Sequence, residues 1–251
     1  LTGAKQRWDR PVGSPSDVFA LTVVWCGDEP HRVGEVLLVD TFGPGFFGRG
    51  EGTGGGRLKL RRIRPGSLRE MAPLSSPSLS RNQFSVSLER DGLRVRNEGR
   101  CSLLVNGDVV DEALLRPGEL FEIENELVML CTSRPPFLEE GPGRETHDFG
   151  RADRFGFVGE GPLSWDIRQR TQRVAQGNAH IVIMGPSGAG KELIAAAVHG
   201  HSSKGGTPLI ARNAATIPEG LVDAELFGNI RDYPNAGMPE RKGLIGASHG
   251  S

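Results

Sequence analysis

The chain has 251 residues, which is enough for one large domain or for two domains of ordinary size. Its hydrophobic content of 37% can fill packed cores, whereas 36 glycines and 17 prolines predict many loops and at least one linker. The formal net charge of −1 excludes a global field that would attract nucleic acid or an anionic membrane, so any such contact needs a local patch.

Residues 1–16 are polar and interrupted by Pro and Gly, and we expect a loose lead-in there. Residues 17–132 have the texture of an all-β domain, in which turn pairs such as Asp91-Gly92 and Asn106-Gly107 separate short strand-like runs. Many short strands of this kind predict a β-sandwich or barrel. The runs are Phe19–Trp25, Gly34–Val39, Gln83–Glu89, Leu93–Arg96, Leu103–Val105, Glu119–Ile123 and Leu127–Cys131.

Residues 50–80 predict a long loop inside this domain, because Glu51–Gly56 is nearly all glycine and Pro73–Ser80 is rich in Ser and Pro. A basic cluster lies between these two stretches. It is either a solvated charged surface or a patch that attracts phosphate or a partner. Its members are Arg57, Lys59, Arg61, Arg62, Arg64 and Arg69.

Residues 133–153 have the composition of an interdomain linker, and the pattern after them is that of an α/β domain. Strands alternating with helices over residues 154–251 predict a parallel sheet. We expect helices at Ser164–Ala175, Lys191–His199 and Pro218–Phe227, and strands at Ala179–Met184 and Pro208–Arg212.

A glycine-rich loop joins the first of these strands to the helix that begins at Lys191. Strand, glycine loop and helix form the context that a phosphate-binding loop requires. Glycines let backbone N–H groups cradle phosphate oxygens, the helix N-terminus favours anions, and Lys191 can reach the terminal phosphates. An ordinary glycine-rich turn is the alternative, since Glu192 replaces the usual Ser or Thr. The candidate nucleotide-binding residues are Gly185, Pro186, Ser187, Gly188, Ala189, Gly190, Lys191 and Glu192.

This loop and the helix after it resemble the sigma-54-dependent transcription activators of the AAA+ class, the bacterial enhancer-binding proteins. Their loop reads G-E-S-G-T-G-K-E, which accounts for Glu192. The resemblance continues through Asn213–Glu219 and Glu225–Gly228, similar to N-C-A-A-L-P-E and E-L-F-G. It implies ATP with Mg²⁺ as cofactors, and it adds Val158 and Gly159 to the nucleotide site, near the adenine.

The resemblance also implies an RNA polymerase sigma factor as partner, self-association into an AAA+ oligomer at full length, and DNA contact only through a domain outside this sequence. The family's G-A-F-T-G-A loop corresponds to Asp232–Gly237, which lacks its Phe and Thr. The Walker B strand is expected just after Ser251, and the end of the chain there suggests a fragment. We therefore assign no catalytic residue in this chain, do not expect efficient ATP hydrolysis from it, and leave open whether the chain is an enzyme.

In the β domain, an Arg and a Ser on neighbouring loops would suit an anion such as phosphate, although a surface Arg and a turn Ser are the simpler interpretation. The spacing of Gly48-Arg49, Ser80-Arg81 and Val105-Asn106-Gly107 resembles a forkhead-associated (FHA) domain, a sandwich that binds phosphothreonine peptides. The resemblance implies a phosphopeptide site. Its candidate residues are Arg49, Ser80, Arg81 and Asn106.

This sequence departs from the FHA pattern in two places. Gln83 occupies the position of a His and can still hold the loop through hydrogen bonds. Residues Arg100–Leu103 replace the family's T-N-G-T loop, so the Asn that grips the peptide backbone is missing.

The two resemblances together favour an ATP-binding transcriptional regulator in which an FHA module, an all-β sandwich, controls an incomplete α/β P-loop domain. A phosphothreonine-peptide adaptor with a vestigial P-loop is one alternative, and a generic P-loop ATPase or kinase is another.

Three scattered cysteines are expected to be free thiols, and no residues are spaced as metal ligands. The lack of a signal segment and of a membrane-length apolar run predicts a cytoplasmic protein.

Overall fold

The structure is a computed structural model that describes residues 17–39, 43–51, 55–141, 147–177, 179–233 and 235–248. The predicted lead-in at 1–16 therefore lies outside the described residues, as does part of the predicted linker. The chain divides into two compact units. The first extends to Asp153 and includes Val158–Asp166, and the second contains Arg154–Phe157 and Ile167–Ser251.

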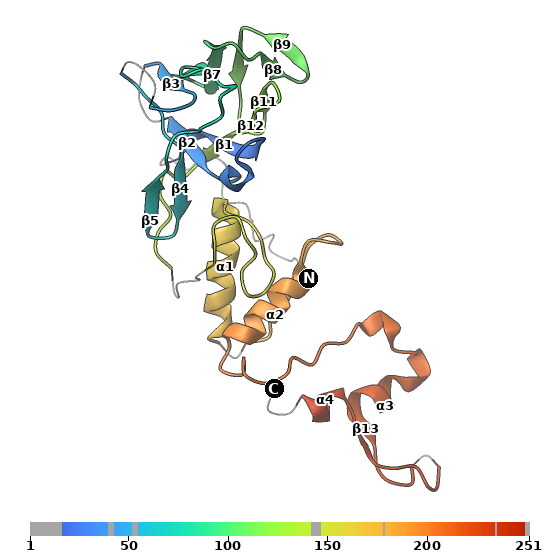
Figure 1. The fold of residues 1–251 in the computed structure, drawn as a ribbon. Coiled ribbons are helices and arrows are strands. Elements are labelled where there is room, and N and C mark those ends of the chain that lie inside the picture. The colour runs from blue at the N-terminus through green and yellow to red at the C-terminus, as the bar shows by residue number, and fades with distance from the viewer. Residues whose placement is uncertain are drawn as a thin grey trace. The chain divides into compact units, whose positions relative to one another are not determined.

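The first unit is a sandwich of two antiparallel sheets, as predicted (Figure 1). Strand order is β5-β4-β2-β1-β12-β11-β8-β9 in the larger sheet and β10-β7-β6-β3 in the smaller one. All seven strand-like runs of the sequence form strands. The strands are β1 (Val18–Cys26), β2 (Val36–Val39), β3 (Gly45–Phe47), β4 (Arg61–Arg64), β5 (Ser67–Glu70), β6 (Phe84–Glu89), β7 (Gly92–Asn97), β8 (Leu103–Val105), β9 (Asp108–Val110), β10 (Glu112–Leu115), β11 (Leu120–Ile123) and β12 (Leu127–Arg134).

The core lies between the two sheets and follows from the alternation of side chains along each strand. In β12 the side chains of Leu127, Met129 and Cys131 are buried, whereas those between them are partly exposed. Phe84 of the smaller sheet meets Phe121 of the larger sheet edge to face, with 5.2 Å between the ring centroids. This aromatic contact joins the two layers at the centre of the sandwich.

Residues 50–80 are not one long loop, which corrects the expectation from composition. Arg61–Arg64 and Ser67–Glu70 form the hairpin β4–β5 at the edge of the larger sheet (Figure 1). Pro65-Gly66 forms the turn, and Gly66 has a φ of 69° that favours glycine.

The basic cluster is mostly tied into the fold by hydrogen bonds and ion pairs. Lys59 pairs with Glu70 at 2.6 Å, and Arg62 pairs with the fully buried Glu35 at 2.9 Å. Arg64 pairs with Glu160, and Arg57 binds backbone carbonyls. Among the described residues, Arg61 and Arg69 are the members of this cluster whose side chains have no hydrogen bond or ion pair. Attraction of phosphate or of a partner by the cluster stays a prediction.

The outer face of the larger sheet carries a second, smaller apolar cluster. Ala20, Val36, Leu38 and Ile63 are buried there, and the cluster also contains Leu138 and Trp165 from the chain that follows β12. Residues assigned by composition to the linker, and the segment after it, thus pack on the sandwich within the first unit.

Two of the three predicted helices form as expected: α1 spans Pro162–Ala175 and α2 spans Lys191–His201. The predicted third helix is divided, because a 3-10 turn at Glu219–Leu221 precedes α3 (Val222–Phe227). Further along, β13 (Gly228–Asn229) pairs with β14 (Arg241–Lys242), and α4 spans Leu244–Ala247.

The two strands predicted at Ala179–Met184 and Pro208–Arg212 are not formed in the second unit. The first of these segments is exposed, with Val182 and Met184 at 84% and 88% of full exposure. A strand of a parallel sheet needs at least one hydrogen-bonded neighbour, and such sheets are covered on both faces. Among the residues that the structure describes, these segments pair with no neighbouring strand.

Two further sequence expectations concern thiols and membranes. All three cysteines are free; Cys26 and Cys131 are buried, and burial raises the pKa of Cys131 to about 11. In the described part of the chain, no helix combines the length and the apolarity that a membrane crossing requires.

Candidate functional site

The Gly48-Arg49 loop and the Ser80 loop meet because β3 and β6 are paired. Phe47, the last residue of β3, lies opposite Phe84, the first residue of β6. The next residue beyond Phe47 therefore faces the residues before Phe84. The Arg49 N–H donates to the Ser80 carbonyl at 3.0 Å, and the Gln83 N–H donates to the Phe47 carbonyl at 2.7 Å. The structure thus brings Arg49 and Ser80 together.

Gly48 is required by this close approach. A Cβ at this position would overlap the carbonyl oxygens of Ser80 and Arg81, which are backbone atoms that cannot rotate away. The absence of a side chain therefore allows the two loops to touch.

The side chain of Gln83 fixes the Ser80 loop through hydrogen bonds, as expected from the sequence. Its side chain is fully buried. Its Oε1 accepts from the Ser80 N–H at 3.1 Å, and its Nε2 donates to the Asn97 side chain at 3.0 Å and to the Cys101 carbonyl at 2.8 Å. An amide can satisfy both sides of this contact, so a His is not needed there.

Arg49 is half-buried, and its Nε–H is fully buried without a hydrogen-bond partner in the described part of the chain. An unsatisfied buried donor is costly unless a ligand accepts from it. An anion beside Arg49 could accept this bond. Arg81 is exposed, and its backbone carbonyl, rather than its guanidinium, takes part in the contacts between the loops.

Asn106 lies at the tip of the β8–β9 hairpin, with a φ of 55°, followed by Gly107 with a φ of 87°. Both values are typical of the tight hairpin turn that the Asn-Gly pair predicts. No described hydrogen bond links Asn106 to Arg49 or Ser80, and its part in a common site stays a prediction.

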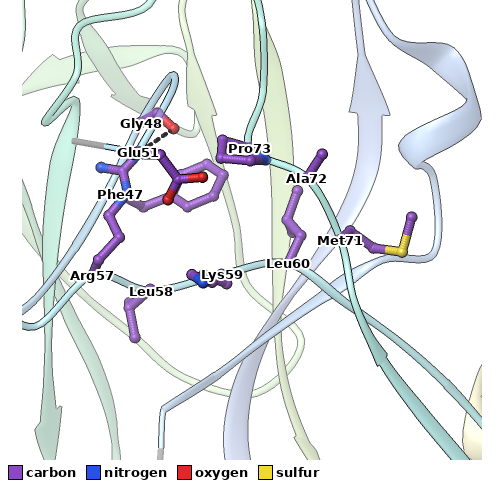
Figure 2. A pocket seen from close by; sticks show the side chains of 10 residues that line it. All are labelled: Phe47, Gly48, Glu51, Arg57, Leu58, Lys59, Leu60, Met71, Ala72 and Pro73. Carbon is purple, nitrogen blue, oxygen red and sulfur yellow. Dashed lines mark hydrogen bonds between the residues drawn. The ribbon is translucent and has the colours of Figure 1, made fainter.

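Two further arginines contact these loops, although the sequence did not assign them to the phosphate site. The Arg100 N–H donates to the Ser80 Oγ at 3.0 Å, and its side chain donates to the carbonyls of Ser78 and Pro77. Arg57 donates to the Arg81 carbonyl of one loop and to the Gly48 carbonyl of the other, the second of which Figure 2 shows. These partners are mostly backbone oxygens, which no side-chain pattern can reveal.

The second candidate site is the loop from Gly185 to Glu192. Gly188 and Gly190 have φ values of 77° and 78°, and Gly190 precedes the first turn of α2 without any side-chain cap. The N–H groups at this helix start are therefore available to an anion. The Lys191 ammonium donates to the Gly185 carbonyl at 3.1 Å and to the Pro186 carbonyl at 2.7 Å, so it folds back over its own loop.

The structure also shows the exposure of the remaining predicted nucleotide-binding residues and the unit in which they lie. Pro186, Ser187, Ala189 and Glu192 are exposed. Val158 and Gly159 lie in the first unit, whereas the loop lies in the second. A common nucleotide site that includes both sets stays a prediction. The described residues contain no group of three or more His, Cys, Asp or Glu side chains placed to hold a metal ion.

The stretch expected at the position of the G-A-F-T-G-A loop joins β13 to β14. Asp232 has a φ of 63°, and its carboxylate accepts from the Gly237 N–H at 2.8 Å. Tyr233 is exposed, and Pro234 lies outside the described residues. At the base of the hairpin, Glu225 pairs with Arg241 at 2.6 Å.

Residues 157–251 match the Sigma-54 interaction domain. This match supports the α/β class expected for the C-terminal part of the chain. Similar proteins are the regulatory protein LuxO of Vibrio cholerae, 37% identical over 95 residues, and the transcriptional regulatory protein GlrR of Escherichia coli, 36% identical over 97 residues. These alignments cover 38% and 39% of this chain and 21% and 22% of the relatives.

A Nif-specific regulatory protein of Azorhizobium caulinodans is 32% identical over 112 residues, which is 45% of this chain and 18% of that protein. The chain thus spans about a fifth of the length of the curated relatives it matches. Among solved structures, the FHA domain of a hypothetical protein of Arabidopsis thaliana matches with a TM-score of 0.32 and 13% identity, over 54% of this chain and 98% of that domain.

Proposed function

We propose that the chain is part of an ATP-binding transcriptional regulator, in which a phosphopeptide-binding sandwich controls a sigma-54-activator-like P-loop region. The observation that carries the proposal is the Gly185–Glu192 loop at the start of α2, within the segment that matches the Sigma-54 interaction domain. The regulatory relatives are consistent with this role. ATP with Mg²⁺, a sigma factor as partner and self-association follow by analogy with the family.

The geometry of the loop fits a phosphate. Two glycines in the left-handed region turn the backbone, and uncapped N–H groups begin α2. Lys191 needs only a rotation of its side chain to exchange two carbonyl partners for phosphate oxygens. Mg²⁺ would arrive with the nucleotide, because its charge is complementary to the phosphates.

Lys191→Ala should weaken binding of ATPγS–Mg by about tenfold or more, because a hydrogen bond to a charged group contributes roughly 1.5–3 kcal/mol. Isothermal titration of the whole chain measures this. Lys204→Ala, which removes an exposed ammonium of the same unit, is the matched control. Equal affinity for Lys191→Ala and wild type, or no binding by wild type, would refute nucleotide binding at this loop.

For the sandwich, we propose that Arg49 and Ser80 bind the phosphate of a phosphothreonine peptide. The buried, unpartnered Nε–H of Arg49 supports this role, as does its position beside Ser80. Arg81 and Asn106 would support the peptide around the phosphate. The spacing that resembles an FHA domain agrees with this assignment.

Arg49→Ala should lower the affinity for a phosphothreonine peptide by about ten- to a hundredfold and leave the weak binding of its unphosphorylated form unchanged, since the loss is that of a charge-assisted contact. Fluorescence anisotropy with a phosphothreonine peptide library can identify and then titrate the tightest peptide. Arg69→Ala removes an exposed arginine of the same unit and is the control. Equal phosphopeptide binding by Arg49→Ala and wild type would exclude the phosphate role.

A phosphopeptide adaptor with a vestigial P-loop is the second candidate. The observation in its favour is that the Lys191 ammonium bonds to its own loop while the flanking segment Ala179–Met184 is unpaired among the described residues. This candidate predicts phosphopeptide binding without ATPγS binding in the two titrations above.

A further inference from the structure

The guanidinium of Arg57 donates hydrogen bonds to oxygen atoms of both loops of the proposed phosphate site. Figure 2 shows its bond to the Gly48 carbonyl. One terminal nitrogen donates to one loop and the other terminal nitrogen to the other loop. The acceptors are the carbonyls of Gly48 (2.6 Å), Arg49 (3.2 Å), Gly50 (2.7 Å) and Arg81 (2.6 Å), and the side chain of Asn82 (3.4 Å).

The backbone of Arg57 is fixed beside β3 before the side chain reaches these loops. Phe46 and Arg57 form a parallel bridge, in which the Leu58 N–H donates to the Phe46 carbonyl at 2.9 Å. Leu58 packs against the main core, and Leu60 is buried in it. The guanidinium also lies 6.0 Å from the centre of the Phe47 ring. The residue is therefore anchored on both sides.

The contacts distinguish Arg57 from an arginine in a salt bridge, because every hydrogen bond that the structure gives its guanidinium ends on a neutral oxygen. Burial lowers the pKa of Arg57, and Glu51 nearby opposes this effect. The small cavity beside Arg57 measures about 10 Å³, which is room for one water molecule at most and not for a ligand (Figure 2). A ligand therefore cannot reach Arg57 through this cavity.

The carbonyls that accept from Arg57 lie next to Arg49 and Ser80, the two residues proposed to bind the phosphate. Gly48 and Gly50 lie on either side of Arg49, and Arg81 follows Ser80. Holding these carbonyls inward fixes the orientation of the neighbouring peptide groups. The opposite sides of these peptides are held as well, because the Arg49 N–H donates to Ser80 and the Gly50 N–H donates to Leu74 at 2.9 Å.

We propose that Arg57 is a positioning residue for the anion site: it fixes the Arg49 loop and the Ser80 loop in one relative arrangement without contacting the ligand. This role rests on the proposed phosphopeptide binding by the sandwich. A planar fork with five donors can satisfy several carbonyls at fixed angles, whereas an ammonium cannot reproduce that geometry.

The first measurement is peptide affinity in Arg57→Gln and Arg57→Lys. We expect both variants to bind the tightest phosphothreonine peptide about tenfold more weakly and the unphosphorylated peptide as weakly as wild type. Lys59→Gln, two residues away on the same strand-like segment, should bind as wild type does. Equal phosphopeptide affinity in both Arg57 variants and wild type would overturn the proposal.

The second measurement needs no ligand and separates this inference from the proposed function. Amide hydrogen exchange of the free chain should become faster at Arg49 and Gly50 in Arg57→Lys, and remain unchanged in the central strand β1. Unchanged exchange at both amides overturns the positioning role, whatever the peptide result. If the wild-type chain binds no phosphothreonine peptide while exchange responds as expected, the proposed function fails and the loop-fixing role stands.

Discussion

Replacing Arg64 by Ala should destabilise the first unit by about 3 kcal/mol or more, because it leaves a buried carboxylate without its main partner. The Arg64 Nε–H donates to Glu160 Oε2 at 2.9 Å, and one terminal nitrogen donates to Oε1 at 2.5 Å. The side chain of Glu160 is only 4% exposed. After the substitution, Glu160 keeps two described contacts. Its Oε1 accepts from the Gly150 N–H at 2.8 Å and lies 3.8 Å from the His147 Nε2.

Arg64 also lies within cation–π distance of two aromatic rings. Its guanidinium lies 5.5 Å from the ring centre of Phe149 and 5.4 Å from that of Trp165. Its other terminal nitrogen donates to the His147 carbonyl at 2.7 Å. One residue of β4 thus binds the segment that begins at His147 and continues to α1.

Urea denaturation followed by tryptophan fluorescence measures the effect, since Trp25 and Trp165 both lie in the first unit. Arg61→Ala on the same strand is the matched control and should change the free energy of unfolding by less than about 0.5 kcal/mol. The double variant Arg64→Ala/Glu160→Ala should be more stable than Arg64→Ala alone, because it removes the unpaired carboxylate of Glu160. A loss below about 1 kcal/mol in Arg64→Ala would show that the pair is not needed for folding.

This ion pair explains why the compact unit extends past the sandwich. The match to the Sigma-54 interaction domain begins at residue 157, and Glu160 and Trp165 of that segment pack on the larger sheet. A shortened chain that ends at Asp153 would expose the apolar face of that sheet, because it lacks Trp165. The predicted division at residue 153 stays a prediction, and a sandwich expressed by itself should include residues up to Asp166.

The strand-like runs from which the sequence predicted the sandwich are rich in apolar residues, and turn pairs such as Asp91-Gly92 and Asn106-Gly107 separate several of them. The hairpin β4–β5 lacks this signal, because Arg61–Arg64 buries only Ile63 fully. Its arginines find acceptors far away in the chain, Arg62 at Glu35 and Arg64 at Glu160. Separations of 27 and 96 residues leave no local pattern from which these pairs could be inferred.

In the candidate site, too, some residues could be predicted from local sequence patterns and others could not. Side-chain motifs locate Arg49 and Ser80, and strand pairing brings them together. The contacts of Arg57 and Arg100 with the loops could not be predicted, because both side chains bind backbone carbonyls, which every residue carries. The second unit illustrates the opposite error: the apolar run Ala179–Met184 has strand composition, but a strand also requires neighbours, and the described residues supply none.

Phe84→Ala should cost roughly 3–5 kcal/mol of unfolding free energy, since it opens a cavity where the two sheets meet. The ring of Phe84 is fully buried and lies 5.2 Å from the rings of both Phe47 and Phe121. Phe84→Leu retains most of the volume and should lose less. Phe137→Ala, at a ring that is 49% exposed, should change stability by less than about 0.5 kcal/mol and serves as the control.

Substitution of Phe84 should also weaken the proposed anion site, because Phe47 and Phe84 are the last and first residues of the strands from which the two loops extend. Phe47 precedes Gly48-Arg49, and Phe84 follows the Ser80–Gln83 segment. Thermal unfolding and phosphothreonine-peptide titration should therefore be compared for Phe84→Leu, which we expect to fold. A loss of stability without a loss of affinity would indicate that Arg57 and Gln83 fix the loops independently of the aromatic contact beneath them.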